Sequence, residues 1–240
     1  MKELENLIEI HQVLHGYKDG HVELASSIKL PPAARRQLAT LSDLSGFGKT
    51  KGFDEYITGY PIEGAPYYAI AKTWYANEMP RPGCVWTHTL LISTEVQEPG
   101  SLLDKLPGLF SRPNNESDYG NYEVRIKHLK SMEHSGSKNV YFTNSKDETF
   151  KKIIFADLFN REEKPVILLA TDSNVFESLI LKIWDSIWPN LKYEFTFCTG
   201  AISPRLLNNN LFNLQAVPNN SSEILRWKSK APSSISKCNT

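Results

Sequence analysis

The chain has 240 residues, of which 40% are hydrophobic and 22% charged; this balance is typical of a globular protein and excludes a disordered one. A chain of this length can bury a core without disulfide or metal staples, as one large domain or two small ones. Its 27 basic and 27 acidic side chains give a formal charge of zero, which argues against nucleic acid as the main partner because phosphate binding usually needs a basic surplus.

The cysteines and the hydropathy of the chain exclude several other classes. Cys84, Cys198 and Cys238 are far apart and form no CxxC pair, so neither a zinc cluster nor a disulfide framework is indicated. The N-terminus lacks the apolar core of a signal peptide, and no apolar run approaches the roughly 18 residues that span a bilayer. We therefore expect a cytoplasmic protein with no membrane association and no cofactor.

The first predicted elements form a β-hairpin over residues 8–27. Apolar and polar side chains alternate in its first strand, with His11 and His15 on the polar face. Residues 16–20 read Gly-Tyr-Lys-Asp-Gly, which is a turn signal, and residues 21–27 alternate again.

The next elements are a helix and three strands. Two prolines open a helix that runs to about Leu44, with leucines spaced as a core stripe. The strands are expected over residues 55–62, 67–75 and 84–93, and the loop 77–83 between the last two is stiffened by two prolines.

The second half mixes helices and strands without a βαβ rhythm. Helices are predicted at 99–110, 150–159 and 174–188, and strands at 122–129, 166–170, 193–198 and 211–217. Asn174 and Glu177 fit a capping box at the start of the last helix. The fold class is therefore α+β, with a largely antiparallel sheet and helices packed on one side. We expect a single domain over 1–228 and a frayed tail over 229–240, with a seam near 111–138 that could separate two lobes.

Ordered blocks of the chain resemble a known family. They lie at residues 11–12, 16–21, 42–46, 56–61, 68–74, 81–90, 188–189 and 195–200, and the most specific reads RPGCVWTHTL at 81–90. Together the blocks resemble the N-terminal domain (type 1) of GTPase-associated protein 1, a component of bacterial conflict systems. The resemblance implies a system built around a GTPase or other effector and used against phage or rivals. It also implies a longer multi-domain protein, so this chain is either a stand-alone version or a fragment, and it offers no catalytic residues to transfer.

A glycine-rich segment over residues 46–50 contains the GKT that ends a phosphate-binding loop. That loop also needs a glycine where this chain has Asp43, and no buried strand precedes it. We interpret the segment as a glycine loop, so the protein is not itself the GTPase.

The histidines of the hairpin could bind a metal. A tight turn would place His15 opposite Glu23, and a longer loop would place it opposite His21. Either register gathers His15, His21 and Glu23 on one face near His11, within reach of a zinc-like ion. The alternative, favoured because no ligand spacing sharpens the signal, is that they are hydrogen-bonded polar residues on the wet side of the hairpin.

Catalysis would also have to use histidine. The candidates are His15, His21 and His88, and His88 could serve Cys198 from a neighbouring strand but not Cys84 on its own strand. Free cysteines are more often buried thiols, so we expect the protein not to be an enzyme.

A recognition surface is the better-supported site. The candidates are Tyr17, Asp19, Trp74, Arg81 and Trp86, because rigid aromatic and guanidinium groups order little on contact. Arg81 could equally brace its loop against a carboxylate.

The function that these observations favour is a non-catalytic adaptor that docks on a GTPase or effector encoded nearby. The alternatives are a histidine- or metal-dependent hydrolase or nuclease, and a single-strand nucleic-acid binder that stacks bases on Tyr and Trp. The neutral charge counts against the last of these.

Overall fold

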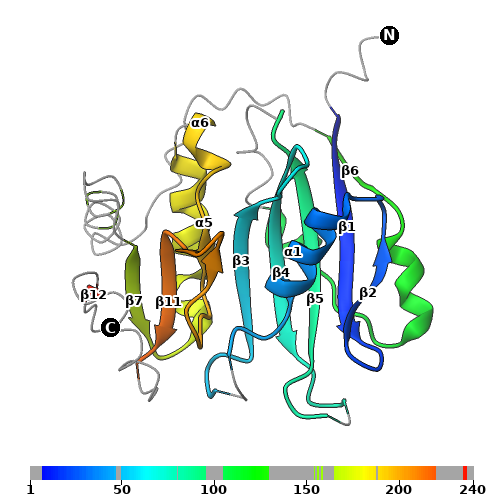
Figure 1. Cartoon of the computed structure of the whole chain (residues 1–240), viewed down its shortest axis with the longest axis horizontal. Coiled ribbons are helices and arrows are strands. Elements are labelled where there is room, and N and C mark those ends of the chain that lie inside the picture. The colour runs from blue at the N-terminus through cyan, green and yellow to red at the C-terminus, as the bar shows by residue number, and fades with distance from the viewer. Residues whose placement is uncertain are drawn as a thin grey trace.

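The computed structural model describes residues 7–46, 50–79, 81–95, 105–129, 154, 156, 158, 165–187, 189–219 and 235–236, and the structural statements below concern these residues (Figure 1). The strands are β1 (Leu7–Tyr17), β2 (His21–Ser26), β3 (Glu55–Pro61), β4 (Tyr67–Tyr75), β5 (Val85–Ser93), β6 (Ile126–Leu129), β7 (Val166–Ala170), β8 (Phe197–Cys198), β9 (Leu206–Leu207), β10 (Asn210–Leu211), β11 (Leu214–Pro218) and β12 (Ile235–Ser236). The helices are α1 (Pro32–Ser42), α3 (Leu106–Leu109), α5 (Glu177–Ser186) and α6 (Pro189–Lys192), with 3-10 turns η2 (Glu116–Tyr122) and η3 (Ser173–Phe176).

Among the described residues, ten of these strands form one mixed sheet. Its order is β12-β7-β11-β8-β3-β4-β5-β1-β2, and β6 pairs with the far end of β1. The strands from β8 to β2 pair antiparallel, whereas β12, β7, β11 and β8 pair parallel. The predicted α+β class with a largely antiparallel sheet agrees with this arrangement.

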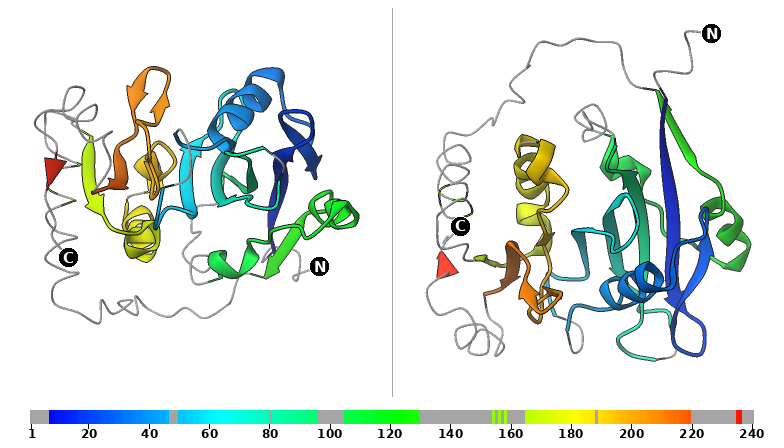
Figure 2. Two further views of the ribbon diagram at one scale, coloured as in Figure 1. Left: turned by 90° about the horizontal axis from the view of Figure 1, so that it is seen from below. Right: turned by 45° about the horizontal axis from the view of Figure 1, so that its top comes forward.

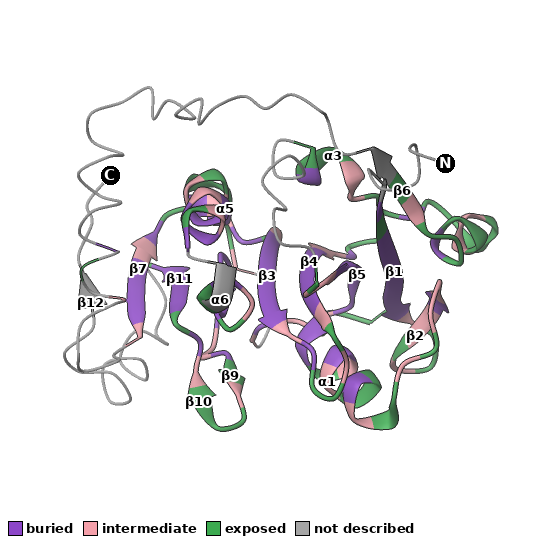
Figure 3. Ribbon diagram, turned by 90° about the horizontal axis from the view of Figure 1, so that it is seen from above, coloured by how far each residue is buried: buried purple, intermediate pink, exposed green. Residues whose placement is uncertain are grey.

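Helices cover both faces of the sheet, so the prediction that they pack on one side is wrong. Residues on β3, β4 and β5 are buried almost without interruption, which happens only when both faces of a strand are covered. On one face, α1 packs on Tyr56, Tyr60 and Leu91. On the other, α5 packs on Ile57 and Tyr68 (Figure 2). We call these the α1 face and the α5 face; α3 lies on the second (Figure 3).

The individual strand predictions hold closely in the first half of the chain. The tight hairpin register is the observed one, with His15 opposite Glu23 and Tyr17 opposite His21. The predicted strand 67–75 matches β4. Gly59 allows β3 and β8 to pair. A Cβ at this position would lie 2.2 Å from the ring of Phe197, so only glycine leaves room for that ring against β3.

The helix predicted over 174–188 begins differently. Residues 173–176 form the turn η3, and α5 starts only at Glu177. The capping side chain is Asp172, which accepts a hydrogen bond from the Asn174 amide, so the predicted Asn174–Glu177 capping box is wrong. Asp172 supplies a side-chain oxygen acceptor two residues before Asn174, and the 3-10 turn η3 lies between it and α5.

The predicted seam and tail are only partly described. Within the seam, β6 joins the sheet through β1, while residues 130–138 lie outside the described residues. Within the tail, residues 235–236 form β12 beside β7 and the others are not described. The predicted helix 150–159 is also mostly outside the described residues. The two-lobe alternative stays a prediction.

Candidate functional site

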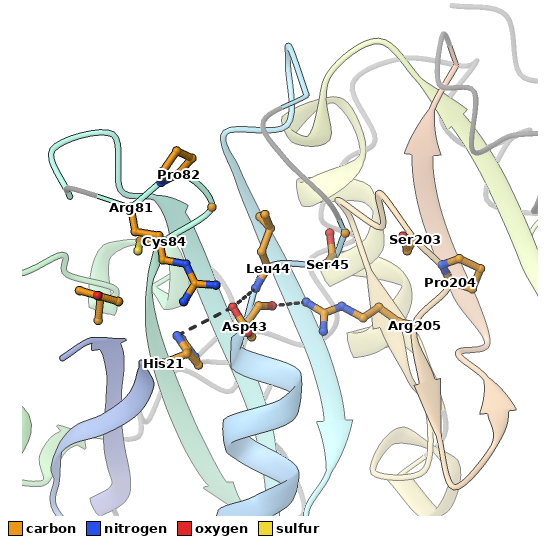
Figure 4. A pocket seen from close by; sticks show the side chains of 13 residues that line it. His21, Asp43, Leu44, Ser45, Arg81, Pro82, Cys84, Ser203, Pro204 and Arg205 are labelled. Atoms are coloured by element: carbon orange, nitrogen blue, oxygen red, sulfur yellow. Dashed lines mark hydrogen bonds and ion pairs between the residues drawn. The ribbon is translucent and has the colours of Figure 1, made fainter. Parts of the chain in front are cut away.

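A pocket of about 500 Å³ opens at the end of the sheet where four segments meet (Figure 4). They are the β1–β2 turn, the residues that follow α1, the β4–β5 loop and residues 203–205. The charged and reactive residues in its lining are Tyr17, His21, Asp43, Arg81, Cys84 and Arg205. Three of the predicted site residues, Tyr17, His21 and Arg81, therefore share one pocket.

Arg205 forms one wall of the pocket and is only 7% exposed. Its guanidinium donates hydrogen bonds to the carbonyl oxygens of Thr40 and Asp43 at the end of α1, and to the hydroxyl of Tyr56. These bonds satisfy carbonyls that a helix end leaves without partners. No acidic side chain among the described residues forms an ion pair with Arg205, and its Nε has no hydrogen-bond partner there.

His21 lies beside the end of α1. Its Nε2 is 2.8 Å from the Ser42 hydroxyl, and its Nδ1 is 4.0 Å from the Asp43 carboxylate. Ser42 donates its own proton to the Ala39 carbonyl, so the serine oxygen accepts from the histidine. Burial lowers the pKa of His21, and the Asp43 carboxylate acts in the opposite direction.

His15 stacks on His21 but is sealed beneath it. The two ring centroids are 5.7 Å apart and nearly parallel. His15 is fully buried, and neither of its ring nitrogens has a partner among the described residues. Burial, with smaller contributions from His21 and Arg35, lowers the pKa of His15 to about 3. The imidazole is therefore neutral at physiological pH and is poorly placed to exchange protons with a substrate.

The other proposed metal ligands are engaged elsewhere. His11 Nδ1 lies 3.1 Å from the Ser27 hydroxyl, and Glu23 pairs with Arg35 at 3.3 Å. Among the described ranges, no group of three or more His, Cys, Asp or Glu side chains is arranged to hold a metal ion. The interpretation of these histidines as residues on the wet side of the hairpin is also wrong for His15, because α1 covers that face.

His88 lies on the α5 face, away from the pocket. It is opposite Leu14 in the sheet, and its ring packs edge-on against Tyr122 at 4.9 Å. Its Nδ1 accepts a hydrogen bond from the Ser111 amide, and burial lowers its pKa to about 3. Cys198 lies on the α1 face, so the suggested pairing of His88 with Cys198 does not occur.

The two described cysteines are protonated thiols. Burial raises the pKa of both Cys84, which lines the pocket, and Cys198, which is fully buried. A thiolate is the nucleophilic form, so a raised pKa makes each sulfur less reactive at neutral pH.

The aromatic recognition candidates gather beside the pocket. Tyr17 and Trp74 are half-buried and pack on the cluster that contains Trp86. Trp86 itself is only 4% exposed, and its Nε1 donates a hydrogen bond to the Glu78 carboxylate at 2.7 Å. Its ring packs against Gly16 so closely that a Cβ at that position would lie 2.4 Å from the ring. Trp86 is therefore a buried residue that supports the β4–β5 loop through Glu78, and not the exposed recognition residue that we expected.

The remaining candidates are exposed at the rim. Asp19 occupies the hairpin turn with φ 57°, and Gly20 follows with φ 153°. Arg81 is exposed on the β4–β5 loop and lines the pocket. No described acid forms an ion pair with it, so the bracing of Arg81 against a carboxylate is not observed in this part of the chain.

Sequence reasoning did not find Arg205. Its main contacts are backbone oxygens at the end of α1, with Asp43 lying 162 residues earlier in the chain. No motif or spacing marks such a pair. The only local signal is an arginine after Pro204 in a segment that has no regular structure.

The first half of the chain matches a known protein family. Residues 9–110 match the family model of GTPase-associated protein 1, N-terminal domain type 1. This match confirms the predicted resemblance over the hairpin, α1 and strands β3 to β5, which carry all of the pocket except the wall at 203–205. The resemblance of the blocks at 188–189 and 195–200 lies beyond the match and stays a prediction.

Neither the search of curated proteins nor the search of solved structures returned a match. No helix in the described part of the chain is long and apolar enough to cross a membrane.

Proposed function

We propose that this protein is a non-catalytic adaptor of a bacterial conflict system that docks on a GTPase, or on an effector encoded nearby, in defence against phage. The match of residues 9–110 to a family named for association with a GTPase carries this proposal. An associated protein needs a surface that another protein can recognise, and the chain offers one at the end of the sheet.

The docking surface consists of Tyr17, Asp19, Trp74 and Arg81, on the β1–β2 turn, at the end of β4 and on the β4–β5 loop. Tyr17 and Trp74 are half-buried and supported by Trp86, so their rings lose little side-chain entropy on binding. Asp19 and Arg81 are exposed and carry opposite charges, which suits a partner with a complementary pattern.

The arrangement of the histidines supports binding rather than catalysis. His15 and His88 are buried, neutral and on opposite faces of the sheet, so they cannot serve one reacting centre. His21 reaches the pocket, but its ring is hydrogen-bonded to Ser42, and the thiol of Cys84 is protonated. General acid–base or nucleophilic catalysis needs titratable groups that converge on one substrate atom.

The test is co-expression of the tagged chain with the GTPase and effector proteins encoded beside it. We expect stoichiometric recovery of one of them with the wild type. The double variant Asp19→Asn, Trp74→Ala should lose most of this recovery, while Arg36→Ala, an exposed change on the outer side of α1, should retain it. Asparagine tolerates the left-handed backbone at position 19, and circular dichroism checks the fold of the tryptophan variant.

Two outcomes would contradict the proposal. If no GTPase or effector is recovered with the wild type, the adaptor function is wrong. If the double variant recovers the partner as well as Arg36→Ala does, the docking surface is wrong.

A further inference from the structure

The pocket contains two guanidinium groups whose charge no described acid neutralises by an ion pair. Arg205 comes from the segment after β8 and Arg81 from the β4–β5 loop, and Figure 4 shows them entering from opposite sides with Asp43 between them and His21 below Asp43. Asp43 is the one carboxylate in the lining; it is half exposed and faces His21 at 4.0 Å. The lining therefore carries two permanent positive charges against one negative charge.

Burial makes the charge of Arg205 significant. An ion that is removed from water is costly unless a counter-charge or a full set of hydrogen bonds replaces the lost hydration. Arg205 has carbonyl and hydroxyl acceptors from Thr40, Asp43 and Tyr56, but its Nε has none among the described residues. Capping α1 therefore explains part of the position of this side chain and leaves its charge unbalanced.

We propose that this pocket binds a small phosphorylated organic molecule, whose phosphate lies between Arg205 and Arg81. Arginine forks match the oxygens of a phosphate, and a phosphate monoester carries close to two negative charges at neutral pH, which matches two guanidinium groups better than a single carboxylate does. The volume of about 500 Å³ is in the range of small-molecule sites and exceeds what a lone phosphate fills. Tyr17, Leu44 and Pro82 give the rest of the molecule an aromatic and apolar wall.

This site shares Tyr17 and Arg81 with the docking surface, but it is tested separately from the adaptor proposal. The variant that tests docking changes Asp19 and Trp74, neither of which lines the pocket. The binding of a small molecule is measured on the chain alone, without a partner. Failure of one proposal therefore leaves the other intact.

The experiment titrates the full chain with phenyl phosphate, inorganic phosphate or benzoate. Binding is monitored by two-dimensional NMR and by calorimetry. Phenyl phosphate combines a phosphate with a flat ring, and we expect it to bind most tightly. Benzoate keeps the ring and replaces the phosphate with a carboxylate, and should bind about tenfold more weakly, since the loss of one charge-assisted contact is worth about 1.4 kcal/mol or more.

Two matched arginine variants locate the site. Arg81→Gln should weaken phenyl phosphate by at least about tenfold, whereas Arg36→Gln, an exposed arginine outside the pocket, should leave it unchanged. Arg205→Lys keeps the charge but loses the planar fork, and should weaken binding if the variant folds. If it does not fold, the comparison of Arg81→Gln with Arg36→Gln still decides.

The imidazole of His21 supplies an independent readout. A bound phosphate would stabilise the imidazolium form, so the pKa of His21 should rise on saturation, while that of His15, which does not line the pocket, should stay low. The proposal is overturned if neither phenyl phosphate nor inorganic phosphate shows saturable binding. It is also overturned if the Arg81→Gln and Arg36→Gln variants bind phenyl phosphate equally well. Equal affinity for benzoate would overturn the assignment to phosphate.

Discussion

The two faces of the sheet are built differently. The α5 face buries aliphatic and aromatic side chains such as Ile57, Ile70 and Trp184, and its buried polar side chains Gln12 and Lys72 are hydrogen-bonded. The α1 face mixes apolar residues with a buried polar stripe that includes His15 and Thr87. Each face is covered by a helix of similar length, α1 on one and α5 on the other, so the contrast comes mainly from the side chains (Figure 3).

Unpartnered polar atoms concentrate on the α1 face. Within the described residues, these buried atoms belong to His15, Tyr60, Thr89, Arg205 and His88, and only the last is on the α5 face. Each such atom costs free energy because its hydration is lost without replacement. The α5 face therefore supplies stability, while the α1 face gives up part of it near the pocket, as functional regions commonly do.

The largest expected effect tests the α5 face. Trp184 is fully buried, stacks on Tyr68 at 5.4 Å, and donates from Nε1 to the Lys192 carbonyl. The change Trp184→Ala should lower the free energy of unfolding by about 3–5 kcal/mol, because it opens a cavity and leaves that carbonyl without its partner. Urea unfolding measures the loss, and a cost below about 1 kcal/mol would show that this face is not the main source of stability.

The next effect compares one histidine on each face through acid sensitivity. Burial lowers the pKa of His15 and of His88 to about 3 in the folded protein, below the usual 6.5. Between these two pH values the unfolded chain binds a proton at each histidine and the folded chain does not. Stability is therefore full above about pH 6.5 and falls as the pH drops through the range below it, by up to about 1.4 kcal/mol per pH unit for each histidine.

Single substitutions assign this acid sensitivity. Between pH 6.5 and 5, His15→Phe and His88→Phe should each remove about 2 kcal/mol of the loss seen in the wild type. Urea unfolding at the two pH values measures it. If either variant keeps the wild-type dependence on pH, that histidine is not held neutral in the folded protein.

The smallest effect distinguishes a satisfied hydroxyl from an unsatisfied one on the same strand and face. Thr87 donates to the Ser42 carbonyl at 2.6 Å and therefore accepts from Thr73, whereas the Thr89 hydroxyl has no partner among the described residues. Thr87→Val should cost about 1–3 kcal/mol, and Thr89→Val should be neutral or stabilising because it removes an unpaired polar atom. Thermal unfolding compares the two variants. An equal loss of stability in both would show that the hydrogen bonds of Thr87 do not contribute to the stability of the fold.

Local pattern predicted most of the first half of the fold. The β-hairpin follows from alternation and a glycine-containing turn, and β4 follows from a run of aromatic and branched residues between turn signals. The conformation of each of these elements depends on residues that are close together in the chain, and a single sequence shows those residues. For the same reason the Tyr17–His21 register was among the predicted alternatives.

The candidate site was predicted only in part. Tyr17, His21 and Arg81 were identified as candidates, because residue type and position in a turn or loop are visible in the sequence. Their convergence in one pocket was not predicted, and neither was Arg205, because its contacts join segments more than 160 residues apart. The burial of His15 and Trp86 was missed because alternation on an isolated hairpin does not show which face a later element covers.

The sequence by itself determined that the chain is globular, mixes helices with a mainly antiparallel sheet, and resembles a GTPase-associated domain over residues 9–110. These properties depend on composition, local periodicity and ordered blocks of residues. The tertiary structure alone decided that α1 and α5 cover opposite faces, and that Arg205 and Arg81 line the same pocket. Both depend on which distant segments pack together, and that choice is made by the burial of the whole core and not by any one segment of it.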